Sequence, residues 1–505
     1  MSDHTRRRLG TTAAILAFLL CEGFFQSSSH ANDTLTTVGR PNIVVILTDD
    51  QGYGDLGCYG HPHLHTPHLD RLAQQGLRLT ACYAPAANCS PTRTGLLTGR
   101  TPARAGVYTA IPMLGPMHLR EGEITLAGLL RDAGYATAVT GKWHVNGHFN
   151  APMHPQPDDH GFDHWFCTQN NALPNHRNPY NFVRNGIPVG PLEGYSADLV
   201  VAEAVRWLEE LRDPEMPFFL CITFHEPHEP IRTADRYRAL YDFPDDPSRE
   251  AYYGNVSQLD AAFGELMGAM RRLGLTENTL VFFTSDNGPA RTRYHRAGSA
   301  GPLRGYKGQL WEGGIRVPGI LYWPGRIRPG TVSDEPVTLL DVLPTLCELA
   351  GVALPEDRHL DGASFAALFD GQPIRRRQPL YWQFHSDRGG SPQVALRDGD
   401  WKLVAFLDRV PAWRGGSMEE DDMDAIKNAQ PERFELYNLR RDIAETTDLS
   451  DAEPQRKQQL VEQLLRIYHE VREEAPVWPA WEHQRYEARR IQWPDYLAGP
   501  APEDR

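Results

Sequence analysis

The sequence lacks the features that would place it in a special structural class. Only 7 of its 505 residues are cysteines, and they are scattered without the close spacing of a disulfide-rich scaffold or of a zinc site. No segment repeats, and none is of low complexity. These absences predict an ordinary globular chain in which most cysteines are buried free thiols. A single disulfide stays an alternative if the protein is exported.

Positive charge and long apolar runs are also scarce. Lys and Arg number 51 against 65 Asp and Glu, which gives a formal net charge of −14 at pH 7. This balance argues against general binding to nucleic acids or anionic membranes, so an anionic substrate would need a local basic pocket. The apolar run from Thr12 to Cys21 is too short to cross a bilayer, and we therefore expect no stable membrane span.

The first 31 residues have the pattern of an export signal peptide. Arg6-Arg7-Arg8 precedes the apolar run, and Ser29-His30-Ala31 has the small-x-small pattern of a cleavage site. Thr5 to Leu9 also resembles a twin-arginine signal, which exports folded bacterial proteins. We therefore expect residues 1–31 to be removed and the mature protein to be periplasmic or secreted.

The rest of the chain predicts two domains and a tail. Apolar runs alternate with helical patterns, which predicts an α/β domain over residues 32–375, with a mostly parallel mixed central sheet flanked by helices. Short strands and a closing helix predict a smaller C-terminal antiparallel-sheet domain with a packed helix over residues 376–476. We interpret Glu419–Asp422 as a solvated loop in that domain. We assign no fold to the tail, residues 477–505.

Polar residues follow four of the predicted strands of the larger domain. They are Asp49 and Asp50 after Ile43–Leu47, Lys142 and His144 after Ala136–Thr140, His225 and His228 after Phe218–Phe224, and Asp286 and Asn287 after Thr279–Phe283. Sites in open α/β sheets lie outside the carboxyl ends of the strands, so these endings should converge on one crevice. The carboxylate and amide oxygens favour a hard cation, Ca²⁺ or Mg²⁺, over zinc. The alternative is that the Asp residues only cap the following helices.

The segment Asn88–Arg100, NCSPTRTGLLTGR, predicts a helix that begins at or just after Cys89. Pro91 suits the first turn of a helix, and Arg93 would lie on the same face as Cys89, where it could hold an oxyanion. From these residues alone, an ordinary buried thiol is the simpler interpretation of Cys89.

The same segment resembles the signature of type I sulfatases, C-x-P-S-R followed by x-x-x-L-T-G-R. Thr92 departs from it, because it stands where the family has Ser. GKWH at Gly141–His144 and LRGYKGQLWEGGIRVP at Leu303–Pro318 resemble further sulfatase blocks. By these motifs the chain resembles formylglycine-dependent sulfatases of the alkaline-phosphatase superfamily. The resemblance spans residues 41–475 and is loose in its last part.

This resemblance implies a modified residue and a bound cation. A formylglycine-generating or equivalent maturing enzyme would convert Cys89 into formylglycine. One Ca²⁺ per chain would be held by Asp49, Asp50, Asp286, Asn287 and the side chain at position 89. Arg93, Lys142 and Lys307 would neutralise the charge of the sulfate ester.

The resemblance also implies a mechanism, in which one hydroxyl of the formylglycine gem-diol attacks sulfur while Asp286 takes its proton. A histidine protonates the departing alcohol, and His144 then removes the proton of the second hydroxyl, which expels sulfate. The family pattern of histidine, any residue, proline and an apolar residue fits His228 better than His225. We therefore assign proton donation to His228 and a supporting role in substrate binding to His225.

Two other functions stay open at this point. A phosphate or phosphonate ester hydrolase of the same superfamily with two metals would need more His and Asp ligands around a Ser or Thr nucleophile. A non-catalytic glycan-binding relative would not need all the polar residues named above. As substrate we expect a sulfated small molecule or glycan, with preference for a carbohydrate cut from an accessible end. The loops Gln169–Asn171 and His176–Arg177 are predicted to contact its hydroxyls.

Overall fold

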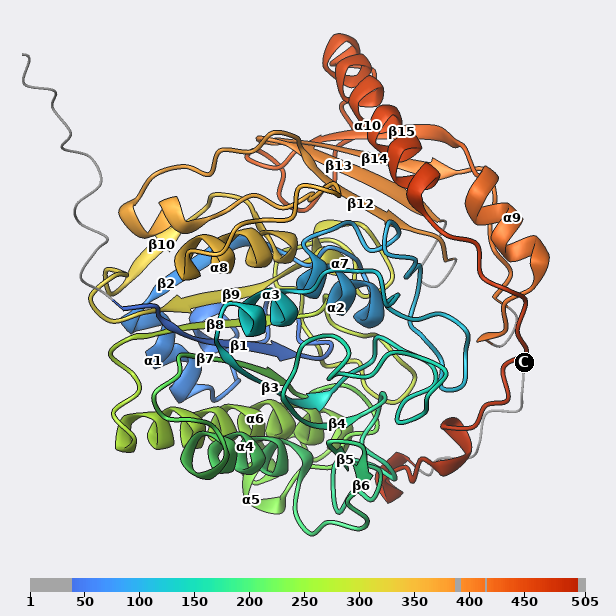
Figure 1. Cartoon of the computed structure of the whole chain (residues 1–505). Coiled ribbons are helices and arrows are strands. Elements are labelled where there is room, and N and C mark those ends of the chain that lie inside the picture. Colours follow the sequence, from blue (N-terminus) through green and yellow to red (C-terminus); the bar gives the residue numbers. More distant parts are fainter. Residues whose placement is uncertain (1–38, 387–391, 414–415, 498–505) are drawn as a thin grey trace, which may run out of the picture. The chain divides into compact units, whose positions relative to one another are not determined.

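A mixed sheet of 11 strands forms the centre of the computed structural model, which describes residues 39–386, 392–413 and 416–497 (Figure 1). The strands lie in the order β10-β2-β9-β8-β1-β7-β3-β4-β5-β6, and β11 pairs with β2. Their bounds are β1 (Asn42–Thr48), β2 (Leu77–Tyr83), β3 (Ala136–Lys142), β4 (His164–Thr168), β5 (Val183–Arg184), β6 (Ile187–Pro188), β7 (Phe218–Thr223), β8 (Thr279–Ser285), β9 (Arg316–Tyr322), β10 (Thr331–Ser333) and β11 (Val337–Thr338).

The central strands β8, β1, β7, β3 and β4 are parallel, and β9 is antiparallel to both of its neighbours. The sheet is therefore mostly parallel at its centre, which confirms the predicted fold class. Strands such as β8 are buried along their whole length, as their continuous apolar sequence indicates. The four predicted strand endings consequently lie at one edge of the sheet.

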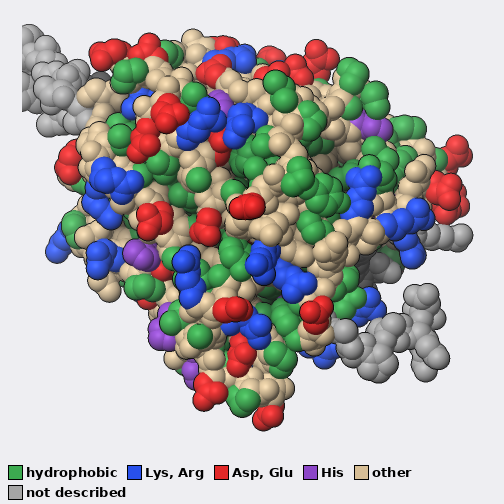
Figure 2. All heavy atoms as spheres, turned by 90° about the horizontal axis from the view of Figure 1, so that it is seen from below, with side chains coloured by type: hydrophobic (Ala, Val, Ile, Leu, Met, Phe, Trp, Pro, Cys, Tyr) green, Lys and Arg blue, Asp and Glu red, His purple; other side chains and the backbone are tan. Residues whose placement is uncertain are grey.

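Helices cover both faces of this sheet (Figure 1). One apolar core joins the sheet to α2 (Cys89–Thr98), α3 (Leu126–Asp132) and α8 (Val342–Ala350). A second core, on the opposite face, joins it to α1 (Pro67–Gln75), α4 (Ser196–Arg206) and α6 (Pro247–Arg272). The short helices α5 (Asp235–Arg238) and α7 (Glu312–Ile315) lie in connections. On the side seen from below, residues of both charges are interspersed (Figure 2).

A separate four-stranded antiparallel sheet follows, as predicted. It consists of β12 (Leu380–Phe384), β13 (Gln393–Asp398), β14 (Trp401–Leu407) and β15 (Pro431–Asn438). The helix α10 (Pro454–Glu474) packs on it through Leu460, Leu464 and Ile467. The proposed boundaries at residues 375 and 476 stay predictions, and the proposed signal peptide lies outside the described residues.

The acidic run Glu419–Asp422 is not a loop, so that prediction was wrong. It begins the helix α9 (Glu420–Asn428). The Glu419 side chain accepts from the backbone at Asp422, and the Asp422 side chain accepts from Glu419 N, which makes a capping box. Acidic residues are favoured at this position because the amino end of a helix carries partial positive charge.

The tail after α10 is irregular, with short 3₁₀ turns at Ala488–Arg490 and Asp495–Leu497. In Figure 1 it is the red segment that runs from the smaller sheet towards β5 and β6. All six cysteines in the described part of the chain are free thiols, and five are buried. No helix within residues 39–386, 392–413 and 416–497 is long and apolar enough to cross a membrane.

Candidate active site

Cys89 is the first residue of α2, at the carboxyl edge of the larger sheet. The side chain of Asn88 caps this helix, because its Oδ1 accepts from Cys89 N at 2.8 Å. The same oxygen lies 3.3 Å from Cys89 Sγ. Gly99, at a φ of 66°, ends the helix as its left-handed cap. Thr92 keeps the hydroxyl in use, since its Oγ1 donates to Ala86 O at 3.1 Å.

Three basic side chains lie around Cys89, and each pairs with an aspartate. Lys307 Nζ is 2.6 Å from Asp50 Oδ1 and 3.6 Å from Cys89 Sγ. Lys142 Nζ donates to Asp49 Oδ2 at 2.5 Å, and Arg93 pairs with Asp286 Oδ2 at 2.9 Å. The strand endings and α2 thus bring together residues that are far apart in sequence. The result is a cluster in which three positive side chains and three aspartates lie together around Cys89.

The carboxylates form a group that fits a hard cation. Asp49, Asp50, Cys89 and His228 each offer one ligand atom, all within 4.8 Å of one another. Asn287 Nδ2 donates to Asp50 Oδ1 at 2.8 Å, and Asp286 Oδ1 accepts from Asp50 N at 3.1 Å.

Two oxygens of this group are buried without a hydrogen-bond partner, Oδ1 of Asp49 and Oδ1 of Asn287. Buried oxygens seldom go unpaired, and a divalent cation would satisfy both. The residues present therefore fit a bound cation, while its identity as Ca²⁺ and the predicted ligand set that includes Asp286 and Asn287 stay predictions.

Neighbouring charges shift the pKa values of these aspartates in opposite directions. Burial alone would raise the pKa of Asp49, but Lys142 and other positive groups nearby hold it well below the usual value. Burial and the negative charge of Asp49 raise the pKa of Asp286, although Arg93 opposes this shift. Asp50 has a φ of 65°, a left-handed conformation that is costly for a residue other than glycine.

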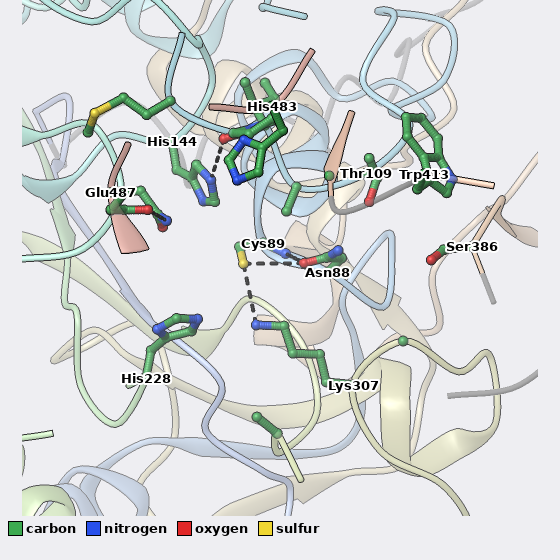
Figure 3. A pocket seen from close by; sticks show the side chains of 18 of the residues that line it. Asn88, Cys89, Thr109, His144, His228, Lys307, Ser386, Trp413, His483 and Glu487 are labelled. Atoms are coloured by element: carbon green, nitrogen blue, oxygen red, sulfur yellow. Dashed lines mark hydrogen bonds between the residues drawn. The ribbon is translucent and has the colours of Figure 1, made fainter. Parts of the chain in front are cut away.

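The two histidines after β7 face different surroundings. His228 lines the pocket beside Cys89, and its Nε2 lies 3.7 Å from Asp50 Oδ2 (Figure 3). Burial lowers the pKa of His228 to about 4, although Asp49 and Asp50 oppose the shift. His225 is 1% exposed and lies behind the pocket, where its Nε2 is 2.8 Å from Thr168 Oγ1.

Thr168 fixes the tautomer of His225. Its hydroxyl donates to Asn170 O at 2.8 Å, so His225 Nε2 must be the donor in its bond with Thr168. His225 thereby supports the loop that carries Asn170, whose side chain lines the pocket.

His144 lies on the other side of Cys89 (Figure 3). Its Nε2 is 3.0 Å from Ile111 O and therefore carries a proton, because a carbonyl oxygen only accepts. Its Nδ1 is buried without a hydrogen-bond partner and is free to take a proton. Burial, together with Lys142 and Arg93, holds the pKa of this ring well below its usual value.

The pocket above Cys89 has a volume of about 500 Å³. Its floor includes Asp50, Cys89, His144, His228 and Lys307. Arg93, Lys142, Asp49, Asp286 and Asn287 lie beneath that floor, each 5% exposed or less. The larger domain contributes three segments to the walls, namely the loop from Thr109 to Met117, Glu229, and Ala290 to Thr292. The smaller domain contributes residues such as Phe384, Trp413 and Met418. The tail contributes Trp481, His483, Glu487, Ala488 and Ile491.

The sequence analysis missed most of the wall. Of the two loops predicted to contact sugar hydroxyls, only Gln169–Asn171 reaches the pocket, through Asn170. The prediction for His176–Arg177 was wrong. His176 is 1% exposed and lies beside Glu226, with their side chains 3.6 Å apart. The concentration of Trp and Arg residues in the tail was the sign in the sequence that this segment packs against the rest of the chain.

Known proteins resemble this chain over both of its sheets. The family model described as Sulfatase matches residues 41–352, and the model described as N-sulphoglucosamine sulphohydrolase, C-terminal, matches residues 306–431. Arylsulfatase A of Homo sapiens is 36% identical over 446 residues, which cover 82% of this chain and 84% of the relative. N-acetylgalactosamine-6-sulfatase of Canis lupus familiaris is 36% identical over 391 residues, covering 72% of this chain and 71% of the relative.

Solved structures show the same arrangement. The crystal structure of Ps i-CgsB in complex with k-i-k-neocarrahexaose superposes with a TM-score of 0.74 at 27% sequence identity. The superposition covers 89% of this chain and 96% of that one. The residues matched by the two family models, 41–352 and 306–431, include Cys89 and most of the smaller sheet.

Proposed function

The chain belongs to the sulfatase family, and from this premise we propose that it removes sulfate from sulfated carbohydrates in the pocket around Cys89. Its activity as a sulfuric ester hydrolase follows from the family and from relatives named arylsulfatase and N-acetylgalactosamine-6-sulfatase. The observation that best supports the site is Lys307 Nζ, 3.6 Å from Cys89 Sγ and 2.6 Å from Asp50. A sulfate group placed there would meet the nucleophile, a cation site and a fixed positive charge together.

Formylglycine and a cation are typical of this family. We assign formylglycine to position 89, where its hydroxyl would supply the nucleophile that attacks sulfur. We assign the cation as Ca²⁺, held by Asp49, Asp50, Asp286, Asn287 and the side chain at position 89. Hard oxygen donors support this choice over zinc. When bound, the cation supplies positive charge that makes a nearby hydroxyl more acidic.

The other side chains have roles in binding the ester and moving protons. Lys307 lines the pocket and neutralises charge on the sulfate oxygens, while Lys142 adds positive charge from beneath the floor, where it pairs with Asp49. Arg93 holds Asp286 in place through its 2.9 Å ion pair. Asp286 accepts the proton of the attacking hydroxyl. His144 would remove the proton of the second hydroxyl at position 89 through Nδ1, because Nε2 is bound to Ile111 O.

His228 donates the proton that the leaving alcohol needs. It lines the pocket, whereas His225 does not. Its ring must gain a proton before it can act as an acid, and the negative charge of a bound sulfate ester favours that protonated form. His225 keeps only a supporting role, through Thr168 and the loop of Asn170.

A carbohydrate substrate is supported by the shape and lining of the pocket and by the relatives. A volume of about 500 Å³ lies within the range of small-molecule sites and exceeds what a sulfate group alone requires. Aromatic walls with a few polar groups suit a ring that carries hydroxyls. Ps i-CgsB binds a neocarrahexaose, and a relative is named for N-acetylgalactosamine 6-sulfate. We further propose that sulfate is removed from an accessible end of the glycan. The protein would reach this substrate by export through the signal at residues 1–31.

The test compares sulfate release from 4-nitrophenyl sulfate with release from a panel of sulfated mono- and oligosaccharides. 4-Nitrophenyl phosphate and a phosphonate monoester are measured in parallel, and Cys89→Ala provides the background rate. We expect at least one saccharide to be cleaved with a higher kcat/KM than the aryl sulfate. Activity confined to aryl or lipid sulfates would refute the carbohydrate substrate, and faster cleavage of the phosphate or phosphonate would favour that alternative function.

A further inference from the structure

We propose that the tail from Trp478 to Trp493 forms the part of the active site that binds the sugar carrying the sulfate. Trp481 and His483 would contact that sugar, and Glu487 would position Asn170. This inference rests on the proposed carbohydrate substrate and adds the segment that selects it. In Figure 3, His483 and Lys307 lie on opposite sides of Cys89, so a sulfate held near Lys307 would direct its alcohol towards the tail.

The tail is attached to the rest of the chain at both ends and in the middle. At its start, Trp478 Nε1 donates to Gly106 O at 2.7 Å. Trp481 then pairs with Met418, which lines the pocket, as an antiparallel bridge with N–H···O distances of 2.6 and 2.8 Å. At its far end, the ring of Trp493 lies 4.1 Å from the ring of Tyr294. These contacts fix the irregular backbone on three separate parts of the chain.

Glu487 makes the central attachment. Its Oε1 accepts from Asn171 N at 2.9 Å, and its Oε2 accepts from Asn170 Nδ2 at 2.8 Å. Both carboxylate oxygens are thus used to hold the loop whose Asn170 side chain lines the pocket. Bonds to a charged acceptor are stronger than bonds between neutral groups, so they fix the orientation of the Asn170 amide.

The tail adds the surfaces that the catalytic floor lacks. The floor consists of charged and imidazole groups suited to a sulfate ester, whereas the tail contributes the Trp481 and His483 rings, whose centroids are 5.5 Å apart. Ala488 and Ile491 extend this wall with apolar surface. Aromatic faces pack against the C–H face of a sugar ring, and imidazole and amide groups bond its hydroxyls.

Gly416 allows the His483 ring to lie where it does. Its φ is 97°, a conformation that side chains rarely adopt, and a Cβ atom built there would be 3.1 Å from the ring. His483 N also donates to Ser417 Oγ at 2.9 Å. The absence of a side chain at Gly416 therefore lets the smaller domain pack closely against His483 of the tail in the pocket wall.

The experiment measures kcat and KM of Trp481→Ala and His483→Ala on 4-nitrophenyl sulfate and on the saccharide that the wild type cleaves best. We expect kcat/KM on the saccharide to fall about 10-fold or more, mainly through KM. The aryl group has no hydroxyls to bind, so kcat/KM on the aryl sulfate should fall by a clearly smaller factor than kcat/KM on the saccharide. Tyr486→Ala is the matched control, because this exposed aromatic residue of the same segment does not line the pocket.

Glu487 is tested as a positioning residue. Glu487→Ala should raise KM for the saccharide by a larger factor than KM for the aryl sulfate. Glu487→Gln should restore part of the loss, because its carbonyl oxygen can still accept from Asn171 N. The unfolding temperature of each variant separates this pattern from a folding defect.

The outcomes distinguish this inference from the proposed function. Equal losses on both substrates, or no loss on the saccharide from Trp481→Ala and His483→Ala, would overturn the role of the tail while leaving the carbohydrate sulfatase intact. A wild-type protein that cleaves aryl sulfate but no saccharide would refute the proposed carbohydrate substrate itself, and the sugar-binding role of the tail with it.

Discussion

The active site and the boundary between the two sheets both bury a cluster of charged side chains. At the boundary, Lys402 lies between Glu445 and Glu312 of α7, and all three side chains are 0% exposed. Lys402 Nζ is 2.9 Å from a carboxylate oxygen of each glutamate. The second oxygen of Glu312 accepts from Tyr83 Oη at 2.6 Å. Glu445 Oε1 has no hydrogen bond, but it lies 2.9 Å from Lys402 Nζ, so every carboxylate oxygen of this inter-sheet cluster contacts a donor or a positive charge.

The active-site cluster is equally buried but incompletely paired. Asp49 and Asn287 each keep one buried oxygen without a hydrogen-bond partner, and Asp50 has a left-handed backbone. Unpaired buried oxygens and backbone strain cost stability unless a ligand offsets them. The comparison separates charge that holds the fold together from charge arranged for a cation and a substrate.

Removing one carboxylate from each cluster tests most strongly whether only the active-site cluster is needed for turnover. We expect Asp286→Asn to lower turnover of 4-nitrophenyl sulfate by more than about 10³-fold, because it removes the negative charge of a proposed cation ligand and the proposed proton acceptor. Glu445→Gln is the matched change in the inter-sheet cluster and should leave turnover of the folded enzyme unchanged. Similar activity losses in both variants would show that the clusters are not functionally distinct.

Removing the shared lysine tests the structural cluster. Lys402→Met leaves Glu445 buried without a positive partner and Glu312 with Arg316 alone, so we expect the free energy of unfolding to fall by about 3–5 kcal/mol. Adding Glu445→Gln should recover part of that loss. Chemical denaturation measures both variants. An unchanged unfolding midpoint for Lys402→Met, or lost turnover in the protein that remains folded, would contradict the assignment.

Substitutions of the two histidines after β7 test which side chain of the active site donates a proton to the leaving alcohol. We expect His228→Ala to reduce turnover of a sugar sulfate by about 10²-fold and to affect an activated phenyl sulfate much less, because phenolate needs little protonation to leave. His225→Ala should affect both substrates alike, since it acts through Thr168. A larger leaving-group dependence in His225→Ala would reverse the two roles.

Chelation of the cation should lower the stability of the protein by a smaller amount, and only through the active-site cluster. A cation that binds only the folded state stabilises it by about 2.7 kcal/mol at 100 times its dissociation constant. We therefore expect chelation to lower the unfolding temperature of the wild type but not that of Asp286→Asn, and Ca²⁺ to restore both stability and turnover. Full activity after exhaustive chelation, or one bound zinc per chain, would count against this site.

The sequence predicted the floor of the site better than its walls. Strand endings such as Asp49-Asp50 and Asp286-Asn287 could be located because buried strands have a clear apolar pattern and a parallel sheet brings their carboxyl ends together. The start of α2 followed from Pro91 in the same way, whereas the cap made by Asn88 was found in the structure. Local rules decide these features.

The walls depend on contacts between distant residues. The bonds of Glu487 with Asn170 and Asn171 cross more than 300 positions and leave no periodic pattern in either segment. The acidic run at Glu419 was interpreted as solvated because its capping role depends on where the helix begins. His176 was placed at the substrate for its chemistry, but the fold buries it beside Glu226.

The most direct test of the central claim measures the residue at position 89 and the activity in the same samples. Preparations made with and without a co-expressed maturing enzyme are analysed by mass spectrometry of the peptide that contains this residue, and sulfate release is measured in each. We predict that formylglycine is found there and that specific activity rises in proportion to the fraction converted. Full activity in protein whose Cys89 is an unmodified thiol would contradict the account.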